Sequence, residues 1–83
     1  MTPDELLRLY PRETLRWLRR RLGLSQLAFA LHLEVSSTTL GRWEARRHGI
    51  SDAHRAQLAA LLAPHLATPE GAAFARSLGR GEG

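Results

Sequence analysis

Hydrophobic residues recur at helical spacing through most of the chain, most clearly between Ser25 and Glu44. Residues one helical turn apart lie on the same face of an α-helix, so a stripe of this kind marks a buried face. Two stripes occur here, on either side of a polar break, and they comprise Phe29, Ala30 and Leu33 and then Leu40 and Trp43. The pattern predicts two short helices joined by a tight turn.

Polar residues mark where these two helices begin and where the chain turns between them. Ser25 is placed to accept hydrogen bonds from the free backbone amides of the first helix, and Ser36 or Ser37 can do the same for the second. Glu34 falls in the intervening turn. The small side chain of Ala30 allows the two helices to cross at close range.

Helical signals continue on both sides of this segment. Thr2 is a candidate cap, with a proline at the first helical position and an acid three residues after the cap. Pro11, Pro64 and Gly79 are expected to interrupt or end helices. The remaining predicted helices span residues 3–10, 11–22, 51–64 and 68–78, with residues 79–83 as a flexible tail.

This arrangement predicts an all-α fold. The chain shows no alternating strand pattern, internal repeat or low-complexity tract, and its 83 residues leave no room for a second core. We expect one domain spanning residues 1–83 and built of five helices, with the short N-terminal helix either one of these five or an addition to them. At 43% hydrophobic residues with two tryptophans, this domain should fold without disulfides or a metal.

Positive charge is concentrated in the middle of the chain. All twelve basic residues are arginine, and nine of them lie between Arg12 and Arg55, against four acidic residues in the same segment. Such a concentration around a pair of short helices is typical of a surface that binds nucleic-acid phosphates. A solvated charged surface without a partner is the alternative, since charge alone does not distinguish the two.

Several classes of protein are disfavoured by what the sequence lacks. Without cysteine there is no disulfide or thiolate ligand, which suits a reducing cytoplasm, and the four histidines have no partners at ligand spacing. We therefore expect no metal and no other cofactor. No nucleophile motif or phosphate-binding glycine loop occurs, so we expect no enzymatic activity. The apolar runs are too short for a membrane span, and the acidic segment 1–5 does not match a secretory signal.

Several positions between Ser25 and Glu44 match a known pattern, and they are Gln26, Ala30, Leu33, Val35, Leu40, Trp43 and Glu44. With these residues the segment resembles the helix-turn-helix of the lambda-repressor/Cro/Xre family of DNA-binding proteins. Glu34 departs from the family, which usually has glycine at this left-handed turn position. A residue with a Cβ adopts that conformation poorly, so we expect a strained or differently shaped turn.

The resemblance implies which residues touch double-stranded DNA. It places base reading on Ser37, Thr38 and Arg42, with Ser36 and Thr39 nearer the DNA backbone. The residues expected to meet phosphates are Gln26, with the amides at that helix start, and Arg46, Arg47 and His48. For the last three, solvated loop charges are the alternative.

The resemblance also implies an ion pair with a structural role. Glu44 corresponds to a buried acid of the family, and its partner would be Arg19 on the helix before the motif. This pair would lock that helix to the second helix of the motif. Arg16, Arg20 and Arg21 are instead expected on the surface.

The function that the resemblance implies is sequence-specific regulation of transcription in the cytoplasm. We expect a repressor that acts as a homodimer on a palindromic operator. One alternative is an antitoxin-type protein that binds a toxin and represses its own operon, because the run from Gly41 to Glu44 resembles those of small antitoxins in this family. Another alternative is binding to RNA, or to DNA without sequence preference.

Leu27 and Leu31 stand where the family usually has polar residues, on the outer face of the first motif helix. Left exposed, they would form an apolar patch that needs a partner. We expect residues 6–10 of the same chain to cover them. Another subunit or a second protein, such as a toxin, is the alternative.

Overall fold

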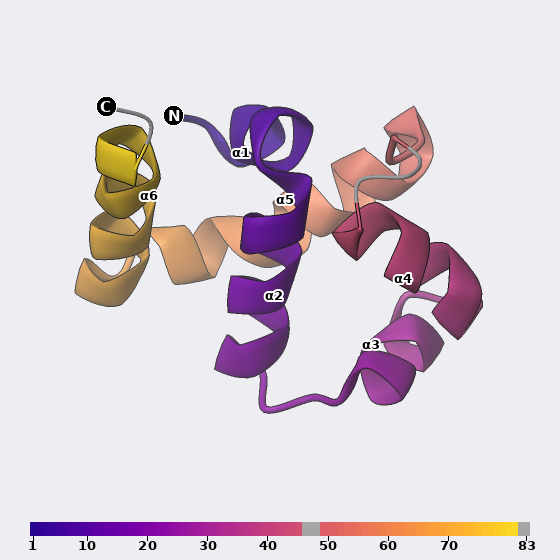
Figure 1. The fold of residues 1–83 in the computed structure, drawn as a ribbon. Coiled ribbons are helices and arrows are strands. Elements are labelled where there is room, and N and C mark those ends of the chain that lie inside the picture. Colours follow the sequence, from indigo (N-terminus) through magenta and orange to yellow (C-terminus); the bar gives the residue numbers. More distant parts are fainter. Residues whose placement is uncertain (46–48, 82–83) are drawn as a thin grey trace.

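The computed structural model describes residues 1–45 and 49–81, with side chains described as far as Leu78. Every secondary-structure element in this part of the chain is a helix, so the fold is all-α, with six helices in place of the expected five (Figure 1). Their bounds are α1 Pro3–Leu9, α2 Pro11–Arg21, α3 Gln26–His32, α4 Ser37–Glu44, α5 Asp52–Leu66 and α6 Pro69–Gly81.

The junction of Tyr10 and Pro11 separates α1 from α2, as the sequence predicts, so the short N-terminal helix is additional to the expected five. Tyr10 has φ −133° and ψ 58°, outside the helical region, because proline disfavours helical backbone in the residue before it. The predicted capping box begins α1: the Glu5 amide donates to Thr2 Oγ1 at 3.1 Å, and the Thr2 amide donates to Glu5 Oε1 at 3.0 Å. The bond from the Thr2 amide is the main reason why the pKa of the Glu5 carboxyl lies below its usual range.

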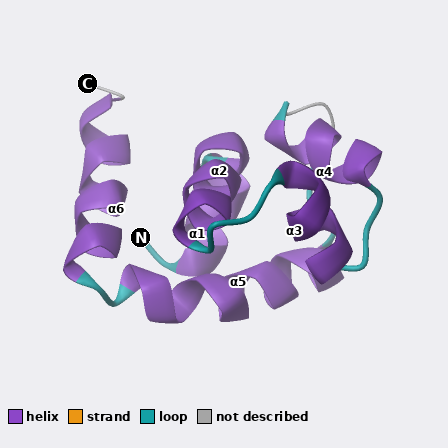
Figure 2. Cartoon of the chain, turned by 90° about the horizontal axis from the view of Figure 1, so that it is seen from below, coloured by secondary structure: helices purple, strands orange, loops and turns teal. Residues whose placement is uncertain are grey.

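The longest helix, α5, extends along the whole molecule (Figures 1 and 2). In both views α6 lies at one end of α5, while α3 and α4 lie at the other end. α1 packs on α5, and α2 contacts both α1 and α4. Within the described residues, no helix is both long and apolar enough to cross a bilayer.

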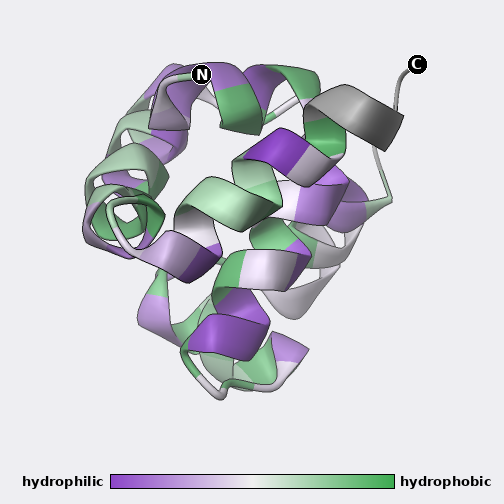
Figure 3. Cartoon of the chain, turned by 90° about the vertical axis from the view of Figure 1, so that its left-hand side faces the viewer, coloured by the Kyte–Doolittle hydropathy of each residue, from purple (hydrophilic) through white to green (hydrophobic). Residues whose placement is uncertain are grey.

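One hydrophobic core joins the helices. Figure 3 shows hydrophobic and hydrophilic residues alternating along them, as amphipathic helices around a shared core require. α1 contributes Leu6 and Leu7, which are both buried. The other buried hydrophobic residues are Leu15, Leu18, Phe29, Ala30, Leu33, Leu40, Trp43, Ile50, Leu58 and Leu62.

The prediction that residues 6–10 cover Leu27 and Leu31 is wrong. Leu27 is 60% exposed and Leu31 is 70% exposed. The physical reason is that α1 buries Leu6 and Leu7 in its packing on α5, not on α3. Leu27 and Leu31 therefore form an exposed apolar patch, which we call the α3 outer face.

The expected ends of the last two helices are also wrong. α5 continues through Pro64 to Leu66, because Leu62 is buried and Leu66 packs on the core. This burial offsets the one backbone hydrogen bond that Pro64 cannot donate. α6 continues past Gly79 to Gly81, so residues 79–81 belong to a helix and not to a tail. The corner between the two helices requires Gly71, since a Cβ there would overlap the His65 carbonyl.

Candidate functional site

α4 carries its buried and its exposed residues on different faces. The buried residues are Leu40, Trp43 and Glu44, and the exposed residues are Ser37, Thr38 and Arg42. An eight-residue helix with its apolar side chains packed on the core turns the others to solvent. All three residues expected to read bases therefore lie on the outward side of one helix.

Hydroxyl groups fix the start of α4. Ser36 Oγ accepts from the Thr39 amide at 3.0 Å and donates to Thr39 Oγ1 at 2.9 Å. Of the two candidates for the N-cap, Ser36 thus takes the role, and Ser37 is the first residue of the helix. Ser36 and Thr39 are engaged with each other at the helix start.

The turn between α3 and α4 contains the left-handed residue that the resemblance implies, although it is not glycine. Glu34 has φ 59°. This conformation lets the Val35 amide reach the Ala30 carbonyl at 3.0 Å and the Glu34 amide reach the Leu31 carbonyl at 3.1 Å. Both bonds satisfy carbonyls at the end of α3, as in a Schellman motif. The turn therefore keeps the left-handed shape, at the conformational cost of a residue with a Cβ.

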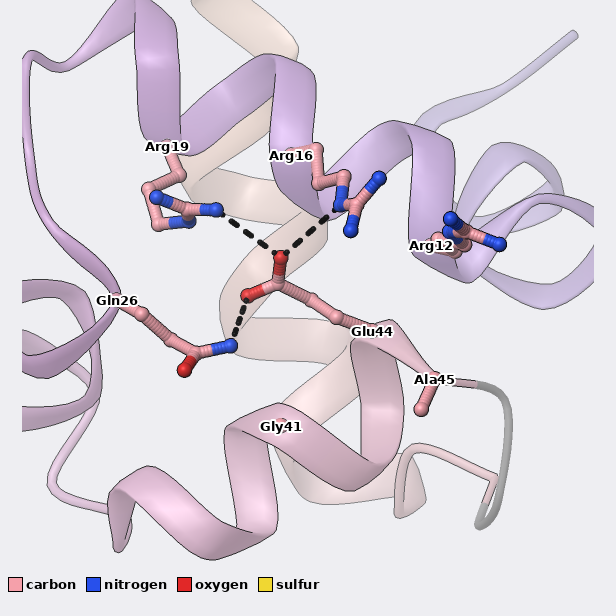
Figure 4. A pocket seen from close by; sticks show the side chains of 7 residues that line it. All are labelled: Arg12, Arg16, Arg19, Gln26, Gly41, Glu44 and Ala45. Atoms are coloured by element: carbon pink, nitrogen blue, oxygen red, sulfur yellow. Dashed lines mark hydrogen bonds and ion pairs between the residues drawn. The ribbon is translucent and has the colours of Figure 1, made fainter.

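Glu44 is a buried carboxylate that joins α2, α3 and α4 (Figure 4). The expected ion pair is present, with Arg19 Nη2 3.2 Å from Glu44 Oε1. The same oxygen lies 3.6 Å from Arg16 Nε, and Glu44 Oε2 accepts from Gln26 Nε2 at 3.3 Å. A buried carboxylate is costly unless it is paired and hydrogen-bonded, and these donors fulfil both conditions. They also fix α4 against the two helices that precede it.

Two of these partners were not predicted. Gln26 was expected to meet a phosphate, but its amide donates to Glu44 while the residue as a whole remains exposed. Arg16 lies one turn before Arg19 on the same face of α2, so helical periodicity is a signal that could have identified it. No local signal indicates the contact of Gln26, which spans 18 residues and depends on how α3 meets α4.

The arginines of α2 divide between two sides of the helix. Arg21 lies toward α6, with its Nη1 3.5 Å from Glu70 Oε1. Arg20 is exposed. Three others lie toward α4, where they line a cavity, and they are Arg12, Arg16 and Arg19. Part of the positive charge beside α4 therefore comes from one face of α2.

Three of the predicted phosphate contacts, Arg46, Arg47 and His48, lie outside the described residues, and their roles stay predictions. The described residues include no group of three or more His, Asp or Glu side chains that could hold a metal ion. No protein-family model, no curated protein and no solved structure matches the chain.

Proposed function

We propose that this protein is a sequence-specific DNA-binding regulator of transcription of the lambda-repressor/Cro/Xre type, which acts as a repressor. The observation that carries the proposal is the outward face of α4, where Ser37, Thr38 and Arg42 are exposed together. Hydroxyl and guanidinium groups are suitable donors and acceptors for base edges, and the major groove of DNA admits an α-helix.

Each exposed residue of α4 has a definite chemical role in this proposal. Thr38 and Arg42 lie one turn apart on the helix, so they address neighbouring base pairs. Arg42 binds guanine O6 and N7 with two donors, which makes it the main source of base discrimination. Ser37 and Thr38 contact either kind of base, and the Thr38 methyl group packs against a thymine methyl.

The Glu44 contacts support this role because a helix that reads bases must be held at a fixed angle. Glu44 receives Arg16 and Arg19 from α2 and Gln26 from α3. The turn at Glu34 adds two backbone hydrogen bonds at the end of α3. A helix fixed before binding loses less entropy when DNA arrives.

Residues beside α4 supply the contacts that are independent of sequence. Gln26 begins α3 and is exposed, and Arg46 and Arg47 follow α4 along the chain. We assign phosphate contacts to all three, which position α4 on the duplex without reading it. Gln26 has a second amide hydrogen for this contact besides the one that it donates to Glu44. Binding should accordingly weaken as the salt concentration rises.

Selection of bound duplexes from a random pool tests this proposal. We expect enrichment of a short motif repeated with inverted symmetry, with half-sites about 34 Å apart, one turn of DNA. The matched control is the Ser37→Ala, Arg42→Ala double variant, which should retain weak binding but enrich no motif. Binding by the wild type without enrichment of any motif would contradict sequence-specific recognition.

A second candidate function is favoured by the exposure of the α3 outer face, with Leu27 60% and Leu31 70% exposed. Apolar side chains that are exposed side by side indicate a protein contact. An antitoxin-type protein would use this face to hold its toxin while α4 binds the operator of the same operon. In this case Leu27 and Leu31 serve the protein partner and Arg42 serves the DNA.

Co-expression with the product of the neighbouring gene tests this second function. The double variant Leu27→Gln, Leu31→Gln should lose the complex while it retains DNA binding. Leu9→Gln is the matched control, because Leu9 is also an exposed leucine, 57% exposed, on a different helix. A complex that survives the double variant, or fails to form with the wild type, would rule out this role for the α3 outer face.

A further inference from the structure

A polar cavity of about 440 Å³ lies between α2 and α4 (Figure 4). It is open to solvent, and Gly41 leaves space on its α4 side, since no side chain extends from that position. A Cβ added at Gly41 would lie 3.9 Å from its nearest neighbour, Gln26 Nε2, which is an ordinary contact. The residues that line the cavity are Arg12, Arg16, Arg19, Gln26, Gly41, Glu44 and Ala45.

Positive charge in this cavity exceeds negative charge. Three of the lining residues are arginines and one, Glu44, is an acid. Arg16 and Arg19 share a single oxygen of that acid, at 3.6 and 3.2 Å. Arg12 forms no ion pair within the described part of the chain. The cavity thus carries about two positive charges that no described side chain neutralises.

The arginines also offer more donors than Glu44 can accept. Arg16 approaches the carboxylate through Nε, and no hydrogen bond or ion pair within the described residues engages its two Nη groups. Arg19 Nε is buried and has no acceptor among the described residues. In Figure 4, Arg12 and Arg16 lie on one side of the Glu44 carboxylate, and Arg19 and Gln26 lie on the other. An oxyanion that enters beside Arg12 and Arg16 would therefore meet unused guanidinium donors.

We propose that this cavity binds a phosphate group, held by the guanidinium groups of Arg12 and Arg16. A phosphate group brings negative charge to the excess positive charge of the cavity, and its oxygens accept paired hydrogen bonds from the planar fork of arginine. Two sources share this chemistry: a backbone phosphate of DNA and a free phosphoanion such as pyrophosphate. Binding of a DNA phosphate rests on the proposed function, whereas binding of a free phosphoanion does not depend on it.

Titration with inorganic pyrophosphate at constant ionic strength, without DNA, tests the second source. Calorimetry should detect one site on the wild type. Arg12→Gln should weaken binding about tenfold or more, as expected for the loss of charge-assisted hydrogen bonds. Arg20→Gln is the matched control: it removes the same charge from an exposed position of α2 outside the cavity, and it should bind like the wild type.

A second variant tests the cavity by its volume instead of its charge. Gly41→Leu places a side chain into the space between α2 and α4 and should abolish pyrophosphate binding. Circular dichroism checks that this variant is folded. Arg12 is exposed and forms no ion pair within the described chain, so Arg12→Gln should not unfold the protein. The Arg12→Gln titration therefore decides the question even if Gly41→Leu fails to fold.

DNA titrations over a range of salt concentrations test the first source. If a DNA phosphate occupies the cavity, Arg12→Gln should reduce the slope of log K against log salt by about one unit, equally on selected and scrambled duplexes. Arg20→Gln should change the slope less. If the protein binds pyrophosphate and Arg12→Gln leaves the salt slope of DNA binding unchanged, the ligand is a free phosphoanion. If the protein binds no pyrophosphate and Arg12→Gln reduces the slope, the ligand is a DNA phosphate.

Other results would overturn the proposal. If Arg12→Gln changes the binding of neither pyrophosphate nor DNA, the cavity is not a phosphate site. If Arg12→Gln and Arg20→Gln weaken binding equally, the protein has only a general attraction for anions. A wild type that binds no DNA would refute the proposed function, but the pyrophosphate titration would still decide about the cavity.

Discussion

At 5% exposure, the Glu44 carboxylate is largely removed from water, and donors from two other helices surround it. Arg16 and Arg19 both point at its Oε1 atom. If the negative charge were lost, two guanidinium groups would remain close together without an anion between them. A single residue thus controls both the stability of this region and the position of α4.

Glu44→Gln should lower the free energy of unfolding by about 2–4 kcal/mol. The loss could lie in the lower part of this range because water can still solvate the Arg16 guanidinium when the carboxylate is gone. Glu70→Gln is the matched control, since it removes the same charge from an ion pair with Arg21 in which Glu70 is 63% exposed. That change should cost less than about 1 kcal/mol. Urea unfolding followed by tryptophan fluorescence measures both. Similar losses in the two variants would mean that Glu44 is no more than a surface partner.

The turn from α3 to α4 shows how an element can keep its shape with an unfavourable residue. Glu34 has φ 59°, and Gly23 takes the equivalent position after α2 with φ 71°. Both positions close the preceding helix with the same pair of backbone hydrogen bonds. The pattern of hydrogen bonds and the packing of α3 and α4 therefore decide the conformation of Glu34, against the preference of its side chain.

Replacement of Glu34 by glycine should raise the free energy of unfolding by about 0.5–1 kcal/mol. Glycine removes the clash of the Cβ at positive φ, and the greater freedom of the unfolded chain offsets only part of that gain. Glu34→Ala retains the Cβ and should give no stabilisation. Thermal unfolding of the three proteins compares them, and an equal gain with alanine would show that charge, not backbone strain, is responsible.

Sequence reasoning succeeded where the cause is local. The caps at Thr2, Ser25 and Ser36 depend on neighbours within one turn, and the structure has all three. It failed where the cause is distant. Pro64 does not end α5, because the burial of Leu62 outweighs a lost hydrogen bond.

The same distinction separates the predicted from the missed parts of the candidate site. The pair of Arg19 and Glu44 followed from the family resemblance and is present. The hydrogen bond from Gln26 to Glu44 depends on how α3 is oriented against α4, and the exposure of Leu27 depends on how α3 lies relative to α1. Local periodicity specifies neither orientation. Sequence patterns assign a residue to a face of its own helix, but not to the helix that covers this face.

On the scale of the whole molecule, the proposed DNA-reading helix and the C-terminal helix lie at opposite ends. α4 is at one end of α5 and α6 is at the other (Figures 1 and 2). The molecule is 32 Å in its longest dimension. Its single exposed α4 surface would read only a few base pairs, which is the physical reason to expect two copies on one operator.

We predict a two-fold dimer on the preferred DNA, with the two α4 helices about 34 Å apart. The contact surfaces are expected at residues 47–53 and in the segment after Leu62, where Ala63, Pro64 and Ala67 are exposed. Sedimentation of the complex should give a protein mass twice the 9.3 kDa of one chain. A monomer, both free and on the preferred duplex, would refute the dimer.

The central claim, that α4 reads bases, is tested most directly by the affinity of Arg42→Ala for the selected duplex and for a scrambled duplex of the same composition. Arg76→Ala is the matched control, because Arg76 is an exposed arginine on α6, at the far end of the molecule. Arg42→Ala should lose about 1–3 kcal/mol of binding free energy on the selected duplex and much less on the scrambled one, while Arg76→Ala should alter neither by a comparable amount. Equal losses on both duplexes would make Arg42 a phosphate contact and contradict base reading by this residue.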